Sequence, residues 1–269
     1  MDIDVIIVST NEKRLLKTAI KSLFAFIGDI KIRIIVIDNN SKDGTSLYVE
    51  RNYPLITIIK NDKIEGFAHN CNLGIKHSNS KYVLLLNPDT EVLPGSIGKL
   101  YNFLETNPKV GICGPQLIFP DGKLQMSCRR FPTWKTAFIR RSPFRGFFVN
   151  SKENRHHLGY DFNHSKSQPI DWLLGACLLI RRKMIKDIGL LDEKYFLYVD
   201  DIDYCWRTWN SGWQVYYVPT SVIVHYHQAE SDRKFFSIHS KYHIKSMLHF
   251  LWKHKYFFKK SFYSTKNYI

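Results

Sequence analysis

Asp4-Val-Ile-Ile-Val-Ser-Thr-Asn11 is a nearly all-apolar run that breaks at its last three residues, which are polar. A run of this length and composition is typical of a buried parallel strand that leads into a helix. In the next segment, residues 15–27, apolar side chains recur at spacings of three and four, with lysine and arginine off that stripe. This spacing predicts an amphipathic helix. The chain therefore begins with a strand followed by a helix.

The strand and helix then repeat along the first third of the chain. Apolar strands are predicted at residues 32–37, 55–59 and 82–86, with helices at 45–52 and 67–75 between them. This alternation predicts an α/β fold, with a mixed, mainly parallel sheet flanked by helices. Each strand ends in polar residues: Ser9-Thr10-Asn11, Asp38-Asn39-Asn40, Asn61-Asp62 and Asn87-Pro88-Asp89. Ligands of such sheets bind beyond the carboxyl ends of the strands, so we expect the functional site there.

The remainder of the chain is predicted to extend the same domain. The expected elements are a helix at 94–105 with Pro94 in its first turn, a strand at 110–113, a hairpin at 120–122, a strand at 172–180, helices at 182–188 and 200–210, and strands at 214–218 and 222–225. Residues 115–170 otherwise show little periodicity, which is typical of a functional or mobile segment. Because there is no internal repeat or linker, we expect one domain at 1–230 and a basic, aromatic, helical extension at 231–269.

The composition indicates a globular protein with anionic partners. The 269 residues are 44% hydrophobic and carry a formal charge of +15. This charge leaves nucleic acid, a membrane surface and phosphorylated small molecules open as partners. The five cysteines have no CxxC spacing and the N-terminus shows no signal peptide, so we expect reduced thiols and a cytoplasmic location. No apolar run approaches the ~20 residues that span a bilayer, so any membrane contact is expected to be peripheral.

Residues 196–207 place three carboxylates, Asp200, Asp201 and Asp203, in an otherwise aromatic and aliphatic segment. A fold that buries the aromatic side chains must hold at least one carboxylate near apolar walls, where its pKa can be shifted. One interpretation is therefore a catalytic base. The other is the acidic first turn of a helix, which the helix dipole favours. The segment alone does not decide between them.

Asp89 and His225 each follow or end a predicted strand. A hard divalent cation binds a carboxylate together with phosphate oxygens and waters, which Asp89 at a strand end would allow. Taken singly, an aspartate after a strand is usually a turn residue, and a histidine there is usually structural. Together on one sheet edge, they form a candidate site with Asp201 between them.

A set of short motifs follows one order along residues 3–231. They are Val8-Ser-Thr-Asn11, Asp38-Asn-Asn-Ser41, Gly66-Phe-Ala with Asn70, Asn72 and Gly74, Leu86-Asn-Pro-Asp89, Asp171-Trp with Gly175-Ala-Cys, Tyr198-Val-Asp-Asp-Ile-Asp203 and His225, joined by Asp121-Gly122, Gln125, Ser127 and Arg129-Arg130-Phe131-Pro132. The ordered set resembles family 2 glycosyltransferases of the GT-A fold, and it is most similar to the rhamnosyltransferase-like branch. The resemblance implies a nucleotide-binding part at 1–115 and an acceptor part at 116–230.

The resemblance also implies a role for each matching residue. The donor nucleotide and its sugar would contact Thr10, Asn11, Asp38, Asn40, Gly66, Asn70, Asn72, Asn87 and Asp89. A Mg²⁺ or Mn²⁺ ion would bind Asp89 and His225, with Asn87 in the place of the family's first metal-binding acid. Asp201 would be the general base. Asp200 replaces a more usual glutamate and would orient the base or contact the acceptor, which leaves Asp203 the structural role.

The implied reaction is an inverting transfer of a sugar to a hydroxyl of a glycan or lipid-linked saccharide, in bacterial cell-surface polysaccharide synthesis. The first candidate donor is dTDP-rhamnose, and a UDP-sugar is the alternative. The other alternative is a basic nucleic-acid-binding protein. Strand-end carboxylates would repel a phosphate backbone, so no nucleic acid is expected.

Two basic segments keep two interpretations each. Residues 231–269 are either helices that cover the core or an interfacial segment at the inner face of an anionic cytoplasmic membrane. The stretch at 115–169 is either an acceptor-side lid or a solvated basic surface; its arginines are Arg129, Arg130, Arg140, Arg141 and Arg145.

Overall fold

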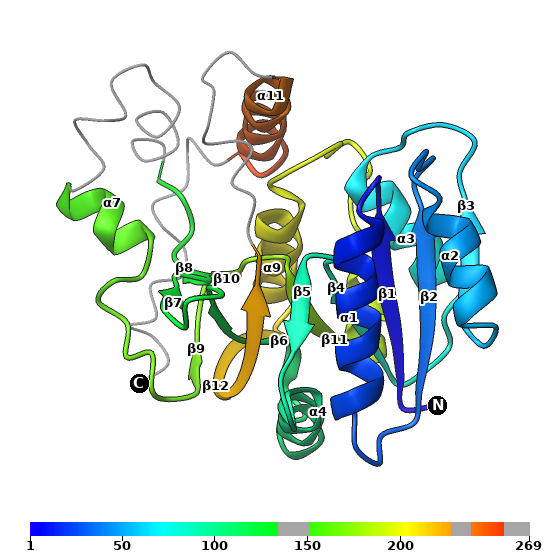
Figure 1. Ribbon diagram of the computed structural model, residues 1–269. Helices are drawn as coiled ribbons and strands as arrows, with labels where there is room; N and C mark the ends of the chain where they lie inside the picture. Colours follow the sequence, from blue (N-terminus) through cyan, green and yellow to red (C-terminus); the bar gives the residue numbers. More distant parts are fainter. Residues whose placement is uncertain (134–150, 227–237, 256–269) are drawn as a thin grey trace.

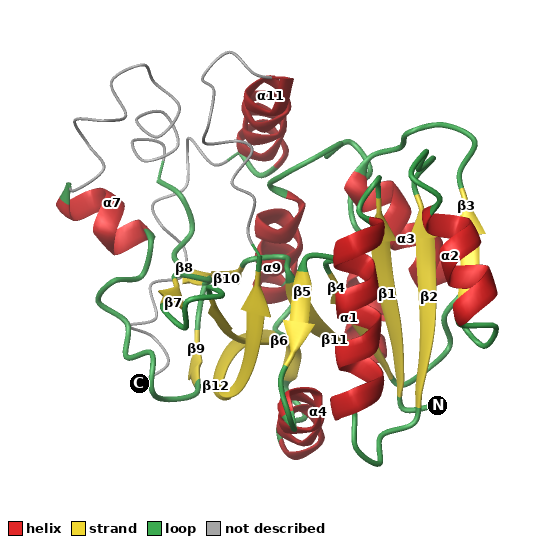
Figure 2. Ribbon diagram, in the orientation of Figure 1, coloured by secondary structure: helices red, strands yellow, loops and turns green. Residues whose placement is uncertain are grey.

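The computed structural model describes residues 1–133, 151–226 and 238–255, so Arg140, Arg141, Arg145 and residues 256–269 lie outside the described residues. Within those ranges a ten-stranded sheet forms the centre of the molecule, with helices on both of its faces (Figures 1 and 2). Its strands are β1 (Ile3–Ser9), β2 (Ile32–Asp38), β3 (Thr57–Lys60), β4 (Tyr82–Leu86), β5 (Thr90–Val92), β6 (Val110–Ile118), β7 (Leu124–Gln125), β9 (Gln168–Pro169), β11 (Cys177–Arg181) and β12 (Gln214–His225).

The strand order is β3-β2-β1-β4-β11-β6-β12-β5, with β7 paired to β6 and β9 paired to β12. β1 runs parallel to β2 and β4, and β12 runs parallel to β6. β11 is antiparallel to both β4 and β6, so these two strands point the same way. The carboxyl ends of β1, β2, β4 and β12 therefore lie along one edge of the sheet. This architecture confirms the predicted mixed, mainly parallel α/β fold.

Two apolar cores lie on opposite faces of the sheet. One is formed with α1 (Lys13–Phe26), α2 (Thr45–Asn52) and α4 (Ser96–Thr106), and the other with α3 (Phe67–Lys76), α8 (Arg182–Ile188), α9 (Asp200–Asn210) and α11 (Ile238–Lys253). The alternation of side chains along each strand explains this division. In β1, Val5 and Ile7 enter the first core, whereas Ile6 and Val8 enter the second.

Residues 128–133 and 151–173 add small elements to this frame. β8 (Cys128–Arg129) and β10 (Trp172–Leu173) form a separate antiparallel pair, and α7 (Lys152–His157) precedes β9. The hairpin predicted at 120–122 is confirmed, because Leu117 pairs with Gln125 across it.

Several predicted boundaries are wrong, and the strand expected at 110–113 continues to Ile118 as β6. Pro94 lies before α4, because Gly95, in the left-handed conformation (φ 71°), caps that helix at its N-terminus. The strand expected at 172–180 is two strands, because residues 174–176 turn away between β10 and β11. The strands expected at 214–218 and 222–225 are one strand with a register shift between Val218 and Val222, where Pro219 cannot donate to the ladder.

Among the described residues, no helix is both long and apolar enough to cross a membrane.

Candidate active site

Asp89 and His225 meet at the edge of the sheet where β5 pairs with β12. Nε2 of His225 lies 3.4 Å from Oδ1 of Asp89, which is an ion-pair distance without hydrogen-bond geometry. Nδ1 of His225 donates to Oε1 of Gln125 at 2.8 Å. This bond fixes the ring so that Nε2 faces the carboxylate. The predicted pairing of Asp89 with His225 is thus present in the structure.

The chemistry of this pair fits a divalent cation. Oδ1 of Asp89 is buried without a hydrogen-bond partner among the described residues, although a buried carboxylate oxygen normally has one. A metal-binding histidine typically donates its other ring N–H to an oxygen, as His225 does to Gln125. Within the described ranges, no group of three or more His, Cys, Asp or Glu side chains is arranged so that it could hold a metal ion by itself. An ion here would therefore need diphosphate oxygens and waters to complete its shell.

The backbone just before α9 is held in an unusual conformation. Tyr198 and Val199 both have positive φ, 66° and 70°, and Val199 is buried. A β-branched residue in this region is a rare outlier, and such strain tends to persist at functional sites. The pair turns the chain so that α9 begins at Asp200, with Asp200, Asp201 and Asp203 in its first turn. The helix-start interpretation of the acidic segment is therefore confirmed.

Asp201 points from the start of α9 toward the turn between β10 and β11. Its Oδ2 accepts a hydrogen bond from the backbone N–H of Gly175 at 3.1 Å, and its Oδ1 accepts one from the N–H of Ile202 at 2.8 Å. Burial raises the pKa of Asp201, although these two bonds and the charge of Arg129 act in the opposite direction. The carboxylate is therefore in an environment that favours proton uptake more than water does.

Two short links connect Asp201 to the strand end that carries Asp89. Gly175 bonds Asp201, and the next residue, Ala176, accepts a hydrogen bond from the backbone N–H of Asn87 at 2.9 Å. Asn87 in turn lies two residues before Asp89, and its carbonyl accepts from the Thr90 hydroxyl at 2.7 Å. The two predicted acid sites therefore share one edge of the sheet, but Asp201 does not lie between Asp89 and His225 as expected, because those two side chains are only 3.4 Å apart.

Asp200 and Asp203 have opposite surroundings. Burial, with the charge of Asp201 as the next cause, raises the pKa of Asp200 well above its ordinary value. Asp203 is also buried, but its carboxylate accepts from Tyr195, Arg207, Lys253 and His254. These donors hold the pKa of Asp203 well below its ordinary value. Asp203 therefore has the structural role that the sequence assigned to it.

The ends of β1 and β2 form a second polar cluster. The amide of Asn39 donates to Thr10 Oγ1 at 3.2 Å. Asn11 has a positive φ of 57°, and its side chain accepts from the N–H of Lys42 at 2.6 Å. Asp38 Oδ1 accepts from the N–H of Ser41 at 2.9 Å, and its Oδ2 accepts from the Ser46 hydroxyl.

Thr10, Asn11, Asp38 and Asn40 therefore lie together, as predicted, with Asn40 also at positive φ (59°). Sequence reasoning gave no role to Asn39, which links β2 to the backbone of Glu65 through two hydrogen bonds of 3.1 and 2.8 Å. The position of Asn39 between Asp38 and Asn40, in the same turn at the strand end, could have indicated its role.

Gly66, Asn70 and Asn72 serve packing in this structure. A Cβ on Gly66 would lie 2.9 Å from Cα of Phe196, so the glycine allows the segment before α9 to approach α3. The Asn70 amide group donates to the carbonyl of Gly66 at 3.0 Å, and its oxygen accepts from Asn61 at 2.6 Å.

Asn72 is also buried and engaged within the protein. Its amide donates to the carbonyl of Leu191 and to Glu193, each at 2.9 Å, and its oxygen accepts from the Leu191 N–H at 3.0 Å. The donor contact expected of Asn72 stays a prediction. The bonds of its side chain tie α3 to residues 191–193, because a buried amide must satisfy all its polar groups.

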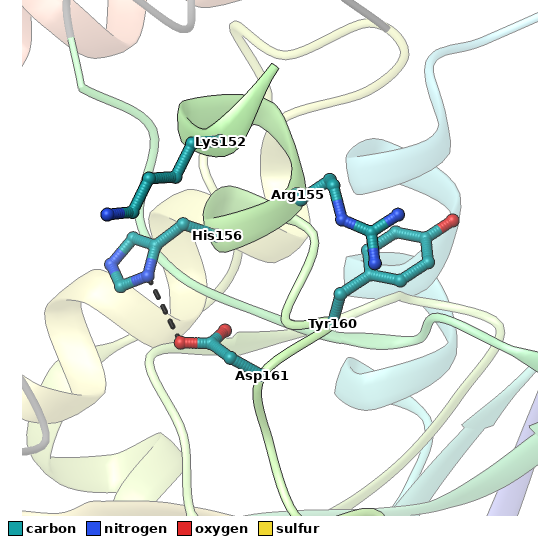
Figure 3. A pocket seen from close by; sticks show the side chains of 5 residues that line it. All are labelled: Lys152, Arg155, His156, Tyr160 and Asp161. Atoms are coloured by element: carbon teal, nitrogen blue, oxygen red, sulfur yellow. Dashed lines mark hydrogen bonds and ion pairs between the residues drawn. The ribbon is translucent and has the colours of Figure 1, made fainter. Parts of the chain in front are cut away.

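A surface pocket of about 380 Å³ lies beside α7 (Figure 3). Its lining residues are Lys152, Arg155, His156, Tyr160 and Asp161. Arg155 stacks on the ring of Tyr160 at 4.5 Å, and Nδ1 of His156 pairs with Asp161 at 3.2 Å. All five side chains are exposed, and none belongs to the predicted donor site. The pocket lies within residues 116–230, the range for which the resemblance implies an acceptor part.

Comparison with known proteins identifies the family of the chain. The model of glycosyl transferase family 2 matches residues 4–189. The N-acetylglucosaminyl-diphospho-decaprenol L-rhamnosyltransferase of Mycobacterium tuberculosis (strain H37Rv) is 28% identical over 239 residues, which cover 82% of this chain and 74% of that protein. Rhamnosyltransferase WbbL of Escherichia coli (strain K12) is 26% identical over 258 residues, covering 92% and 91%.

Solved structures show the same fold at low identity. A crystal structure of GalNAc-T7 with UDP, GalNAc and Mn²⁺ aligns with a TM-score of 0.63 at 16% identity, over 86% of this chain and 44% of that one. The mannosyltransferase PcManGT from Pyrobaculum calidifontis, in complex with GDP-Man and Mn²⁺, aligns with a TM-score of 0.58 at 18% identity, over 85% and 57%. The chain thus spans about half the length of these two structural neighbours.

Proposed function

Because the chain belongs to glycosyl transferase family 2, we propose that it is an inverting, metal-dependent enzyme that moves a sugar from a nucleotide diphosphate to an acceptor hydroxyl. The observation that carries this proposal is the shared sheet edge of two acid sites. The carboxylate of Asp201 accepts a hydrogen bond from Gly175, and the next residue, Ala176, accepts one from Asn87. Asp89, two residues after Asn87, pairs with His225. The reaction needs one acid site to take the proton of the attacking alcohol and another to hold the cation that binds the leaving diphosphate.

Asp201 is the proposed general base. An alcohol is a poor nucleophile until its proton is taken, and a carboxylate with a raised pKa is better matched to that transfer near neutral pH. The N–H of Gly175 and that of Ile202 hold the carboxylate in place. Attack from the face opposite the diphosphate then inverts the anomeric centre in a single displacement.

Asp89 and His225 are the residues that would hold Mg²⁺ or Mn²⁺. The ion would supply positive charge for the diphosphate as it leaves. The protein's own contribution is orientation, because Gln125 fixes the tautomer and direction of His225. Thr10, Asn11, Asp38 and Asn40, at the ends of β1 and β2, are the proposed contacts of the nucleoside.

Rhamnose is the first candidate for the transferred sugar, from dTDP-rhamnose to a glycan or lipid-linked acceptor. The names of the two curated relatives support this choice, and one of them also names a diphospho-decaprenol. The UDP in one structural neighbour keeps a UDP-sugar as the alternative donor. Incubation of the purified protein with dTDP-, UDP- and GDP-sugars and Mn²⁺ or Mg²⁺, followed by nucleotide release, tests the choice. If none is turned over or stabilises the protein, the proposal fails.

Asp201→Asn is expected to bind the donor as the wild type does but to lose transfer by about 10²- to 10⁴-fold, the usual contribution of a general base. Donor-induced thermal stabilisation measures binding, and product formation measures transfer. Asp29→Asn is the matched control, because Asp29 is an exposed aspartate near the amino end of β2, at the opposite edge of the sheet. Full transfer by Asp201→Asn would remove this residue as the base.

Asp89→Ala is expected to abolish the part of donor binding that depends on metal. In the wild type, we expect Mn²⁺ to increase donor-induced thermal stabilisation and a chelator to reverse that increase. The variant should show the same small stabilisation with and without Mn²⁺, since only His225 would remain of the pair. A response to Mn²⁺ equal to that of the wild type would exclude Asp89 as a ligand.

A further inference from the structure

The C-terminal helix α11 has one face packed into the core. Met247, Phe250 and Leu251 are buried in the apolar cluster that includes α9. The ring of Phe250 lies 6.0 Å from that of Trp206 in edge contact, and the hydroxyl of Ser246 donates to the carbonyl of Leu197 at 2.9 Å. The expectation that the tail covers the core is therefore confirmed for this face of α11.

The adjoining, outward-facing side of α11 exposes large apolar side chains. Ile244, Leu248 and Trp252 are 42%, 60% and 74% exposed. Their spacing of four places them in one row along the helix. Lys241 and Lys245 are exposed on the same side, and Lys255 is exposed just beyond the helix end. These six residues are called the outer face of α11.

The positive charge of the C-terminal residues indicates which kind of partner binds the outer face of α11. From residue 233 to the end of the chain there is no Asp or Glu, and the whole chain carries +15. A row of apolar side chains flanked by lysines matches the boundary of an anionic bilayer, where apolar groups enter the acyl region and ammonium groups meet phosphates. We propose that the outer face of α11 docks on an anionic lipid surface.

The docked helix is fixed relative to α9. Lys253 bonds Asp203 at 2.8 Å and Asp192 at 2.7 Å, and His254 bonds Asp203 at 2.7 Å. Asp203 lies two residues after Asp201 in the first turn of α9. Docking would therefore hold the start of α9 at a set distance from the lipid plane. If the proposed function is correct, a lipid-linked acceptor would meet the base in this arrangement.

Vesicle binding by the full chain tests the proposal without any catalysis. We expect binding to phosphatidylcholine vesicles that contain phosphatidylglycerol and little binding to phosphatidylcholine alone. Leu248→Ser/Trp252→Ser should weaken binding by at least about tenfold, from lost apolar burial. Lys241→Gln/Lys245→Gln should weaken it most at low salt, where charges are least screened. The exposed positions of all four residues allow both variants to fold, which thermal melting checks.

Leu55→Ser is the matched control, because Leu55 is 91% exposed and precedes β3, the far edge strand of the sheet. It should bind as the wild type does. Equal binding to neutral and anionic vesicles, or wild-type binding by Leu248→Ser/Trp252→Ser, would overturn the proposal. Absence of vesicle binding, with a wild-type dimer that the same double variant dissociates, would assign the face to a second copy instead. Nucleotide release with a soluble acceptor is measured separately. The docking proposal and the proposed enzymatic function can therefore fail independently of each other.

Discussion

Asp201 is subject to opposing influences. Burial raises its pKa, whereas the N–H groups of Ile202 and Gly175 and the charge of Arg129 lower it. Arg129 is itself placed by the β8–β10 pair, where its guanidinium lies 5.3 Å from the ring centre of Trp172 and donates to the carbonyl of Met126 at 3.1 Å. Arg129 therefore helps to keep this half-buried carboxylate ionised at the pH where a base must accept a proton.

Arg129→Gln is expected to move the acid limb of the pH–rate profile to higher pH. A base works when it is deprotonated, so activity rises as pH increases through the pKa of Asp201. Loss of the Arg129 charge removes an influence that lowers this pKa, so the rise should begin at higher pH. Transfer rates measured across pH at saturating donor check the shift.

Two further variants separate charge from packing at this position. Arg129→Lys keeps the positive charge and should leave the acid limb near that of the wild type, although it loses the contact of the guanidinium with the ring of Trp172. Arg155→Gln removes a charge that stacks on Tyr160 beside α7 and should not move the limb. Equal shifts in Arg129→Gln and Arg129→Lys would show that the charge is not responsible.

Single residues at strand ends were the most predictable part of the site. Parallel strands bring their carboxyl ends to one edge, so Asp38, Asp89 and His225 could be assigned to it before any contact was known. Asn72 shows the limit of this reasoning. Whether a buried amide faces a ligand or another segment depends on its partners, and Leu191 lies 119 residues away in the chain.

At the scale of elements, α9 depends on the turn that precedes it. Tyr198 and Val199 take two successive left-handed conformations, which direct the first turn of the helix toward Gly175. The buried side chain of Val199 and the stacking of Phe196 on Tyr242 at 4.6 Å hold this turn against α11. The strain is maintained by packing around it.

A comparison of glycine and alanine at position 199 tests this strain. Both variants remove the same buried side chain, so the loss of packing is nearly equal. At an ordinary φ, alanine is the more stable of the two by about 0.5 to 1 kcal/mol. At a φ of 70°, Val199→Gly should instead be more stable than Val199→Ala by about 1 kcal/mol, because only glycine avoids the left-handed penalty.

The free energy of unfolding of each variant, from denaturant titration, checks the order. Position 215 offers a control, because Val215 is also buried but lies within β12. There, Val215→Ala should be more stable than Val215→Gly. The same order at both positions would mean that the turn is not strained.

The periodic elements of the first 106 residues were predictable because each helix buries one apolar face against the sheet and the central strands are short apolar runs buried on both faces. The break at residues 174–176 was not, because it is set by two long-range bonds, from Asn87 to Ala176 and from Gly175 to Asp201. The left-handed pair at 198–199 was not predictable either, since neither tyrosine nor valine favours that conformation.

At the scale of the whole molecule, Asp203 joins the C-terminal helix to the sheet domain. Its Oδ1 accepts from Tyr195, Lys253 and His254, and its Oδ2 accepts from Arg207 at 2.9 Å. The side chain of Asp203 is 1% exposed, so its charge depends entirely on these donors. Two of them, Lys253 and His254, belong to the end of α11. This cluster therefore couples α11, and the outer face it carries, to α9.

Asp203→Asn is expected to destabilise the protein by about 3 kcal/mol, the usual result of leaving buried cations without their carboxylate. The pKa of Asp203 is below its ordinary value of 3.8, so its stabilisation is complete above that pH and is lost as pH falls further. The part of the difference between wild type and variant that comes from the ionisation of Asp203 should thus shrink as pH falls below about 4. Denaturant titration at a series of pH values measures it.

Hydrogen exchange of residues 238–255 tells whether the loss is local to the link. In Asp203→Asn, exchange in α11 should rise more than in β1 or β4, because α11 loses two ties and those strands lose none. Asp161→Asn is the matched control. Asp161 pairs with Arg130 at 2.5 Å but is 51% exposed, and such surface pairs contribute less than about 1 kcal/mol. If both variants lose the same stability, Asp203 does not join α11 to the domain.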